Sequence, residues 1–322
     1  MLSRLSILVA LGLCLGACAP QGASDAETPQ ATATPLPVPT EAPASPTSAA
    51  PPRGPRGDLS QHAGSMQSNA TYCTVDGVEL KMNFYSPKDV SGPTPLVVYV
   101  HGGGWSKGSK DGGAGMQDTP VLLDAGFSVA TLDYRLAPQY KFPAMIDDVK
   151  CAIRSLRAHA AEYNIDADRI GVWGGSAGGH LVSLLGVTDE QAGFDVGEYL
   201  NQSSRVQAVV DLFGPADLTT GFSKGFTDVR DQVFGTFDLA LASPVTYISP
   251  DDPPFLILQG DADRLVPVSQ SQELYDQLTA AGVDATLVIV HNGPHGLGAP
   301  DQSPSREELT RMILQFFEEN LK

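Results

Sequence analysis

One serine of the chain has neighbours suited to nucleophilic chemistry. Ser176 is flanked by Gly174 and Gly178 and directly follows an apolar stretch that ends at Trp173. A strand that turns sharply into a helix exposes a serine hydroxyl only where the flanking residues lack bulk, which is the geometry of a nucleophile elbow. The pattern also fits an ordinary glycine-rich turn, because the sequence contains 33 glycines. Its meaning therefore depends on partner residues elsewhere in the chain.

A run of three glycines lies upstream of this serine. The segment 101–105 reads His-Gly-Gly-Gly-Trp and follows the apolar run 96–100. Consecutive glycines after a strand let backbone N–H groups converge on one point, and acyl transfer needs such donors for the oxyanion that develops during the reaction. We predict that the amides of Gly103, Gly104 and Ala177 form this oxyanion hole.

An acid and a base follow the serine in the chain. Asp263 lies in a loop after the apolar run 255–258, and His295 lies in a loop after the run 285–290. The order Ser176, Asp263, His295 is that of an α/β-hydrolase and differs from the orders of the chymotrypsin and subtilisin types. Each residue comes just past the end of a predicted strand, where open α/β sheets place their sites.

Each of these two loops offers a second candidate. Asp261 lies nearer the end of its strand, where its side chain could fix the loop by accepting backbone hydrogen bonds. His291 directly ends a strand, whereas His295 lies among small residues that would let its ring reach the serine. We assign Asp263 and His295 to the catalytic triad and keep Asp261 and His291 as the alternatives.

The other four histidines are not expected to take part in proton transfer. His101 is expected to anchor the glycine loop by a hydrogen bond, and His180 to pack within the helix that follows the serine. His62 and His159 are expected at the surface.

The elements that must position these residues alternate along the chain. Tyr72 to Tyr85 alternates in polarity around Asp76-Gly77, which predicts an opening hairpin. Further apolar runs predict strands at 96–100, 127–132, 169–173, 206–213, 255–259 and 285–290. Segments with helical periodicity separate the later runs, so we predict an α/β fold: a mostly parallel, eight-stranded sheet with helices on both faces.

Several helices are predicted by their apolar stripes. One stripe consists of Val149, Ala152, Ile153 and Leu156, and another, of Leu309, Met312, Ile313, Phe316 and Phe317, follows a capping box of Ser305 and Glu308. A third helix, at 269–281, is expected to end at Gly282. The Gly-rich and polar segment 214–244 is expected to form a lid or pocket wall, and Trp105, Phe213 and Phe222 are our candidates for the acyl pocket.

Taken together, these motifs resemble the α/β-hydrolase family of exported carbohydrate esterases, the bifunctional feruloyl and acetyl xylan esterase-like group, which is close to the hormone-sensitive-lipase-type esterases. The resemblance covers about residues 70–322 and rests on the segments 101–105, 133–138, 142–144, 168–180, 212–218 and 260–267. Lipase-type esterases often carry an acidic residue where this chain has Gly175, a difference that favours the carbohydrate-esterase branch. The His-Gly-Gly-x-Trp pattern also occurs in kynurenine formamidases.

The resemblance implies a serine esterase that acts on short or aromatic acyl groups of carbohydrates and needs neither a metal nor an organic cofactor. Another α/β-hydrolase activity, that of a general carboxylesterase, an arylformamidase or a peptidase, remains an alternative. A catalytically inactive surface binding protein is the alternative from a different class. The sequence does not specify the oligomeric state.

The N-terminal part of the chain has a different composition. Residues 1–17 combine Arg4 with a short apolar core, which is typical of a signal peptide and too short to cross ~30 Å of hydrocarbon. Cys18 follows small residues, so we predict a lipoprotein signal, lipidation at Cys18 and a bacterial membrane anchor that leaves the catalytic domain outside the cytoplasm; ordinary cleavage after Ala17 or Ala19 is the alternative. Residues 18–60, rich in Pro, Ala, Ser and Thr, predict a disordered tether, and residues 61–322 the catalytic domain.

Charge and cysteine content restrict the partners. The net charge of −17 and the absence of a cluster of Lys and Arg argue against nucleic-acid binding. No spacing of His and Cys suggests a metal site. Export would permit a disulfide, but Cys73 lies in the hairpin and Cys151 beside an apolar helix stripe, so we expect two separate buried thiols.

Overall fold

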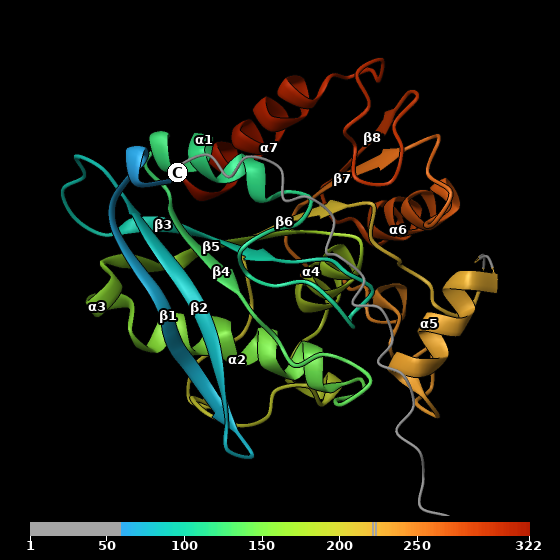
Figure 1. The fold of residues 1–322 in the computed structure, drawn as a ribbon, viewed down its shortest axis with the longest axis horizontal. Coiled ribbons are helices and arrows are strands. Elements are labelled where there is room, and N and C mark those ends of the chain that lie inside the picture. Colours follow the sequence, from blue (N-terminus) through green and yellow to red (C-terminus); the bar gives the residue numbers. More distant parts are fainter. Residues whose placement is uncertain (1–58, 221, 223) are drawn as a thin grey trace, which may run out of the picture. The chain divides into compact units, whose positions relative to one another are not determined.

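The computed structural model describes residues 59–220, 222 and 224–322. The predicted signal segment, Cys18 and nearly all of the predicted tether lie outside these residues, so the boundaries proposed for them stay predictions. The described chain contains one eight-stranded sheet in the order β1-β2-β4-β3-β5-β6-β7-β8 (Figure 1). Its strands are β1 (Ala63–Val75), β2 (Val78–Pro87), β3 (Thr94–Val100), β4 (Ser128–Leu132), β5 (Ile165–Gly175), β6 (Ala208–Leu212), β7 (Phe255–Gly260) and β8 (Ala285–Val290).

Only the first strands depart from the parallel arrangement. β1 pairs with β2 and β2 with β4 in antiparallel fashion, whereas every neighbouring pair from β4 to β8 is parallel. The predicted hairpin is confirmed, and its turn residues Asp76 and Gly77 both have positive φ, as a two-residue hairpin loop that matches the strand twist requires. β1 begins at Ala63, well before the predicted start at Tyr72. The sequence did not predict this part because residues 64–69 are exposed on both faces and show no alternation of polarity.

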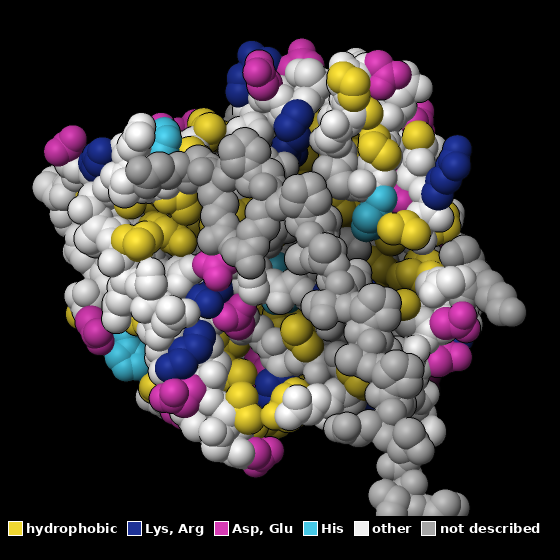
Figure 2. Space-filling model, viewed as in Figure 1, with side chains coloured by type: hydrophobic (Ala, Val, Ile, Leu, Met, Phe, Trp, Pro, Cys, Tyr) yellow, Lys and Arg dark blue, Asp and Glu magenta, His cyan; other side chains and the backbone are white. Residues whose placement is uncertain are grey.

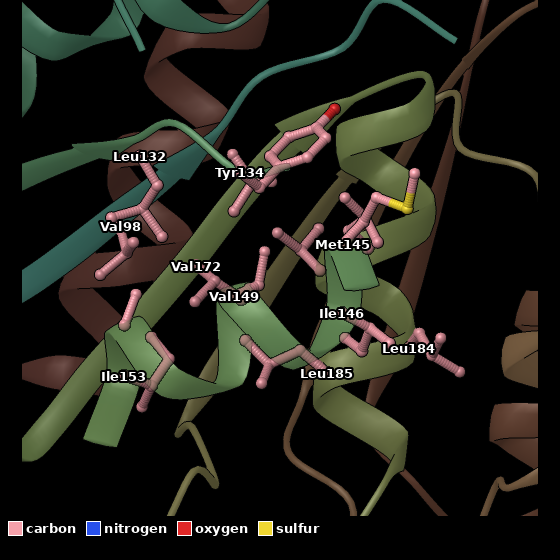
Figure 3. Packing of buried hydrophobic residues seen from close by; sticks show 14 of the residues in the cluster. Val98, Leu132, Tyr134, Met145, Ile146, Val149, Ile153, Val172, Leu184 and Leu185 are labelled. Atoms are coloured by element: carbon pink, nitrogen blue, oxygen red, sulfur yellow. The ribbon is translucent and has the colours of Figure 1, made fainter. Parts of the chain in front are cut away.

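Helices cover both faces of the sheet, as predicted. They are α1 (Thr119–Asp124), α2 (Ala144–Ala158), α3 (Ala160–Tyr163), α4 (Ala177–Val187), α5 (Lys224–Phe234), α6 (Val268–Ala281) and α7 (Arg306–Leu321). Leucines of α1 and residues of α7 pack with one set of strand side chains, and α2, α4 and α6 pack with the alternate set. Figure 3 shows the second core, in which Val149 and Ile153 of α2 face Val98 and Val172 of the sheet.

The helix ends follow the sequence signals. Ser305 and Glu308 form the predicted capping box of α7 by reciprocal side-chain and backbone hydrogen bonds. Gly282, with φ of 87°, caps the C-terminus of α6, as predicted. Within the described residues, no helix is both long and apolar enough to cross a membrane. On the face shown in Figure 2, the Lys and Arg side chains of the described residues are dispersed among acidic ones.

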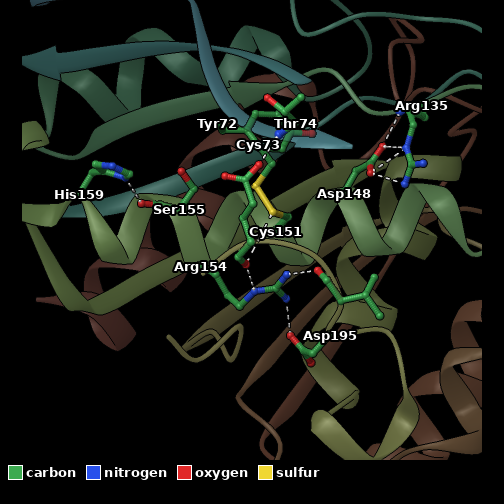
Figure 4. The surroundings of a disulfide bond; sticks show 12 residues. Tyr72, Cys73, Thr74, Arg135, Asp148, Cys151, Arg154, Ser155, His159 and Asp195 are labelled. Carbon is green, nitrogen blue, oxygen red and sulfur yellow. Dashed lines mark hydrogen bonds and ion pairs between the residues drawn. A yellow bond between two sulfur atoms is a disulfide. The ribbon is translucent and has the colours of Figure 1, made fainter. Parts of the chain in front are cut away.

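The prediction of two separate thiols is wrong. Cys73 of β1 and Cys151 of α2 form a disulfide, with Cα atoms 6.5 Å apart (Figure 4). The two cysteines are 78 residues apart in sequence, and only the packing of the hairpin across α2 brings them together. By restricting the unfolded chain, a loop of this length stabilises the fold by about 4 kcal/mol in the chain-entropy description.

Charged pairs flank the disulfide on both sides along α2. Arg135 pairs with the fully buried Asp148, and Arg154 pairs with Asp195 (Figure 4). Each carboxylate neutralises a guanidinium group. Removing one partner of such a pair would leave the other charge buried and unpaired, which would destabilise the fold. The disulfide and these two ion pairs thus link α2 to β1, to the loop after β4 and to the segment around Asp195.

Candidate active site

Ser176 occupies a strained turn between β5 and α4. Its φ of 58° and ψ of −121° lie in a region that residues with side chains rarely adopt. The flanking glycines make the turn possible: a Cβ on Gly174 would lie 2.6 Å from backbone atoms of Gly178, and a Cβ on Gly178 would lie 2.1 Å from the carbonyl oxygen of Val100. This is the strand–turn–helix context that a nucleophile elbow requires.

Gly175, where lipase-type esterases often carry an acidic residue, has no room for a side chain. A Cβ at this position would lie 2.9 Å from the carbonyl oxygen of Ala114 and 3.1 Å from the Phe213 ring. The departure noted in the sequence thus has a steric cause in the packing around the elbow.

The glycine loop after β3 lies directly against the elbow. A Cβ on Gly102 would be 2.5 Å from the carbonyl oxygen of Gly175 and 3.4 Å from Cβ of Ser176. Gly103 and Gly104 have φ of 119° and 60°, and within the described part of the chain their amides donate to no backbone carbonyl. Ala177 is the first residue of α4, so its amide has no carbonyl partner within the helix. The structure thus brings the glycine loop against Ser176, next to the start of α4, and the oxyanion-hole role of the three amides stays a prediction.

His101 anchors this loop, as predicted. Its ring is buried, lies 2.7 Å from the carbonyl oxygen of Gly102 through Nδ1, and stacks on Tyr134. Burial lowers its pKa, so the ring is held in the neutral form. The Tyr134 hydroxyl donates to the carbonyl oxygen of His101. This histidine is part of the scaffold of the loop.

The aspartates of the loop after β7 (the acid loop) and the histidines of the loop after β8 (the histidine loop) form two separate pairs. Nδ1 of His295 lies 2.7 Å from Oδ2 of Asp263, whose side chain is 1% exposed. Nδ1 of His291 lies 2.9 Å from Oδ2 of Asp261, and the His291 side chain is 78% exposed. The buried pair has the protection from solvent that a base and its orienting carboxylate need, and the exposed pair lies beside it.

Asp263 is held as a carboxylate. Burial, the largest single effect, raises its pKa, but the hydrogen bond with His295, the charge interaction with His295 and the hydrogen bonds from the amides of Val266 and Leu265 together outweigh it, so the pKa of Asp263 lies below its usual value. Two further donors, the amides of Leu265 and Val266, contact Oδ1. An ionised Asp263 fixes Nδ1 of His295 as the protonated nitrogen and leaves Nε2 free to accept a proton.

Gln259 also supports Asp263, a role that was not predicted from the sequence. Its side-chain amide donates to Oδ2 of Asp263 at 3.3 Å, and its carbonyl oxygen accepts from the hydroxyl of Ser271. The signal in the sequence was an amide side chain at the end of an otherwise apolar strand, where a buried polar group must have partners.

The three acyl-pocket candidates lie in different surroundings. Phe213 is buried, with its ring against Gly175 and 4.7 Å from the His295 ring between centroids. Trp105 is also buried, and its indole N–H donates to Nδ1 of His180. Phe222 is half-buried and stacks on Phe226 of α5. Phe213 and Trp105 thus pack beneath the loops, and the acyl-pocket role of all three stays a prediction.

Part of the predicted lid segment does approach the glycine loop. A Cβ on Gly104 would lie 3.4 Å from Val229 of α5, and the Phe226 ring packs on Trp105 with centroids 6.0 Å apart. His180, predicted to be a packed helix residue, is fully buried and contacts the carbonyl oxygen of Ala242 through Nε2. Burial lowers the pKa of His180 to about 4, so it stays neutral at physiological pH.

Two surface grooves lie away from these loops. The larger, of about 630 Å³, is lined by the start of β1, the end of β2 and residues 162–164. The other, of about 300 Å³, lies between residues 189–191 and 203–205. Neither is lined by Ser176, Asp263 or His295, so we assign the site from its side chains and not from the shape of the surface. Among the described residues, no group of three or more His, Cys, Asp or Glu side chains is arranged to hold a metal ion.

A buried acid lies beneath the elbow. Asp211, at the end of β6, accepts a hydrogen bond from the amide of Gly214, and a Cβ on Gly179 of α4 would lie 2.3 Å from its Oδ1. Burial without a cationic partner raises the pKa of Asp211 to about 7. The carboxyl group of Asp211, which packs against α4 just after Ser176, is thus protonated below about pH 7.

We expect Asp211→Asn to flatten the pH dependence of stability. In the folded state the pKa of Asp211 is about 7, above the 3.8 of an ordinary aspartate. At pH values between these two, the folded state therefore keeps a proton that the unfolded state releases. The contribution of Asp211 is therefore present below pH ~4 and is lost as pH rises to ~7, a change on the order of 4 kcal/mol. The amide keeps the acceptor for Gly214 and has no proton to lose.

Urea unfolding at about pH 5 and about pH 8 measures this difference. Asp231→Asn, at an exposed position, serves as the control. An Asp211→Asn variant that loses as much stability as the wild type between these pH values would contradict the assignment.

The sheet, the strained serine after β5 and the His–Asp pair after β7 and β8 define an α/β-hydrolase. A family model described as BD-FAE matches residues 82–278, and the chain belongs to this family. The family match agrees with the resemblance seen in the motifs.

Named relatives and solved structures are of the same kind. The chain is 36% identical over 203 residues to "Probable carboxylic ester hydrolase LipM" of Mycobacterium tuberculosis, covering 59% of this chain and 46% of that protein. A "truncated form of carbohydrate esterase from gut microbiota" is 31% identical, with a TM-score of 0.70 and coverage of 83% and 99%. Propionate-bound Est2, a thermophilic esterase of Thermogutta terrifontis, is 26% identical, with a TM-score of 0.67 and coverage of 78% and 93%. The chain spans about half the length of the curated relatives it matches.

Proposed function

We propose that the protein is a serine esterase that hydrolyses carboxylic esters through Ser176, His295 and Asp263. The observation that carries this proposal is the 2.7 Å contact between His295 and the buried Asp263 at the strand ends that also present the strained Ser176. Family membership and the names of the relatives support the reaction class.

In the proposed mechanism, Ser176 is the nucleophile of the first step. Nε2 of His295 takes the hydroxyl proton while Oγ attacks the ester carbonyl, and Asp263 stabilises the imidazolium that forms. The amides of Gly103, Gly104 and Ala177 donate to the oxyanion.

Collapse of the tetrahedral intermediate transfers the proton from His295 to the departing alcohol and leaves an acyl-enzyme on Ser176. Water then attacks this ester with His295 again as the base. Collapse of the second tetrahedral intermediate returns the proton from His295 to Oγ of Ser176 and releases the carboxylic acid. The sequence of steps uses only side chains and amides of the chain and one water molecule.

We further propose short or aromatic acyl groups of carbohydrates as substrates. The carbohydrate esterase and the propionate-bound esterase among the similar structures support this choice. Trp105, Phe213 and Phe222 remain the proposed acyl-pocket residues. The choice of substrates is tested with a panel of nitrophenyl esters from acetate to octanoate, acetylated xylan, methyl ferulate and formylkynurenine. Preference for formylkynurenine would favour the amide-cleaving alternative.

A serine-directed fluorophosphonate label distinguishes the enzyme from an inactive binding protein. We expect labelling of the wild-type chain at Ser176 and its loss in Ser176→Ala. An unlabelled wild-type protein would favour the binding-protein alternative.

We also propose that the protein is an exported lipoprotein anchored at Cys18. The Cys73–Cys151 disulfide supports export, because such bonds persist mainly in oxidising compartments. Two or more acyl chains on Cys18, at ~0.8 kcal/mol per buried methylene, make membrane attachment effectively stable.

We expect the wild-type protein to fractionate with membranes of its native host and Cys18→Ser to be unlipidated with unchanged kcat, because Cys18 precedes the predicted catalytic domain. Mass spectrometry of the mature N-terminus measures the modification. An unmodified wild-type terminus would replace this proposal by ordinary secretion.

A further inference from the structure

The loop that carries His295 has little support from the sheet. β8 is an edge strand, and beyond its end the chain contacts the loop after β7 and, through two backbone hydrogen bonds at His291, Ser303 of its own loop. His295 lies beyond the end of β8 at Val290, within this loop. Its position relative to Asp263 therefore depends on contacts within this loop and on contacts with the loop after β7.

Backbone contacts join the two loops at their start. The amide of Asp261 donates to the carbonyl oxygen of Val290, and the amide of Ala262 donates to that of Gly293. A Cβ on Gly260 would lie 2.0 Å from the carbonyl oxygen of Gly293, so the chains touch without an intervening side chain. The first turn of the histidine loop is thus built directly on the acid loop.

The carboxylate of Asp261 connects the loops a second time. Its Oδ1 accepts from the backbone amide of Asn292 at 2.7 Å, and its Oδ2 lies 2.9 Å from Nδ1 of His291. Asn292 has a φ of 57°, the left-handed conformation that turns the chain from β8 toward His295. The bond to the Asn292 amide holds this turn at the residue where the chain changes direction.

The two contacts of Asp261 differ in strength. Its pairing with His291 is exposed to solvent, with 37% and 78% of the side chains accessible, and such pairs contribute little to stability. The bond to the amide has a charged acceptor and a donor fixed by the backbone, which makes it stronger and directional. Asp261 is therefore expected to act through the geometry of the loop.

We propose that Asp261 is a positioning residue, which holds the turn at Asn292 so that His295 meets Asp263. This inference rests on the function proposed above, because it assigns His295 the role of the base. Asp261 itself does not touch the substrate. Displacement of a catalytic group by about 1 Å can lower the rate by about 100-fold, so a modest shift of this loop is enough to be measured.

The test compares variants at this position in the full chain. Asp261→Ala removes both contacts, and we expect kcat for nitrophenyl acetate to fall by about 10- to 100-fold with KM nearly unchanged. Asp261→Asn keeps an oxygen acceptor for the Asn292 amide and is expected to recover most of the activity. Asp189→Ala is the matched control, because exposed Asp189 likewise accepts a backbone amide, that of Gln191, at another loop.

The pH profile separates positioning from a structural defect. The carboxylate of Asp263 favours the protonated imidazole, so a longer distance between Asp263 and His295 moves the acid limb of kcat/KM to lower pH. Partial unfolding would lower kcat and leave the limb in place. We expect the limb to move in Asp261→Ala and to return in Asp261→Asn.

Three results would overturn the inference: wild-type kcat in Asp261→Ala, an unmoved acid limb, or an equal loss in Asp189→Ala. If circular dichroism shows that Asp261→Ala does not fold, Asp261→Ser takes its place with the same expectations. Ser176→Ala is assayed alongside. Its inactivity together with an unaffected Asp261→Ala rejects this inference alone, whereas activity in Ser176→Ala rejects the proposed function.

Discussion

Ser176→Ala is expected to lower kcat by on the order of 10⁴ or more, as removal of a triad nucleophile does. The physical reason is that no neighbour at the elbow can form the acyl-enzyme in its place, since Gly175, Ala177 and the three glycines 102–104 carry no nucleophilic side chain. Turnover of nitrophenyl acetate measures the loss, and circular dichroism confirms that the variant is folded.

Ser68→Ala is the matched control for this substitution, because Ser68 is exposed in β1 and belongs to none of the site loops. It should keep wild-type turnover. Retention of more than about a tenth of wild-type activity in Ser176→Ala would reject Ser176 as the nucleophile.

His295→Ala should lower kcat to a similar extent, by on the order of 10⁴, because no base then takes the proton of the serine hydroxyl. His291→Ala should keep most activity, since its exposed ring pairs with Asp261 and leaves the buried Asp263 untouched. In the wild type, kcat/KM should fall as the pH is lowered on the acid side, because a protonated imidazole cannot act as a base.

Assays of the two variants over a pH series decide between the histidines. Activity retained in His295→Ala and lost in His291→Ala would transfer the role of base to His291. A flat pH profile would show that the measured rate does not depend on a histidine.

Local patterns in the sequence were sufficient for the sheet. The strands at 96–100, 255–259 and 285–290 are apolar runs of strand length bounded by turn residues, and the structure contains them with nearly the same limits. β3 and β7 are buried on both faces, and such burial leaves an apolar run in any sequence, so the run can be recognised without knowing the neighbours. β8 is only partly buried, but its residues are apolar apart from Thr286. The first half of β1 was missed because both of its faces are exposed and no pattern results.

The locations of the site residues could likewise be predicted, because parallel strands end at one edge and the loops after them converge. The sequence could not determine which aspartate faces which histidine. Asp261 and Asp263 share one loop, and His291 and His295 share another, so the pairing depends on turn conformations such as that of Asn292. These conformations are set by contacts between loops that are distant in sequence.

By itself, the sequence determined the order and type of the elements, the elbow glycines and the composition of the two parts of the chain, since these follow from side-chain size and periodicity. Only the tertiary structure decided that Cys73 and Cys151 are bonded, that Phe213 lies against His295 and that Gln259 supports Asp263. Each of these contacts joins side chains from different segments or turns. The direction of a side chain in space depends on the packing of the whole domain and leaves no local signal in the sequence.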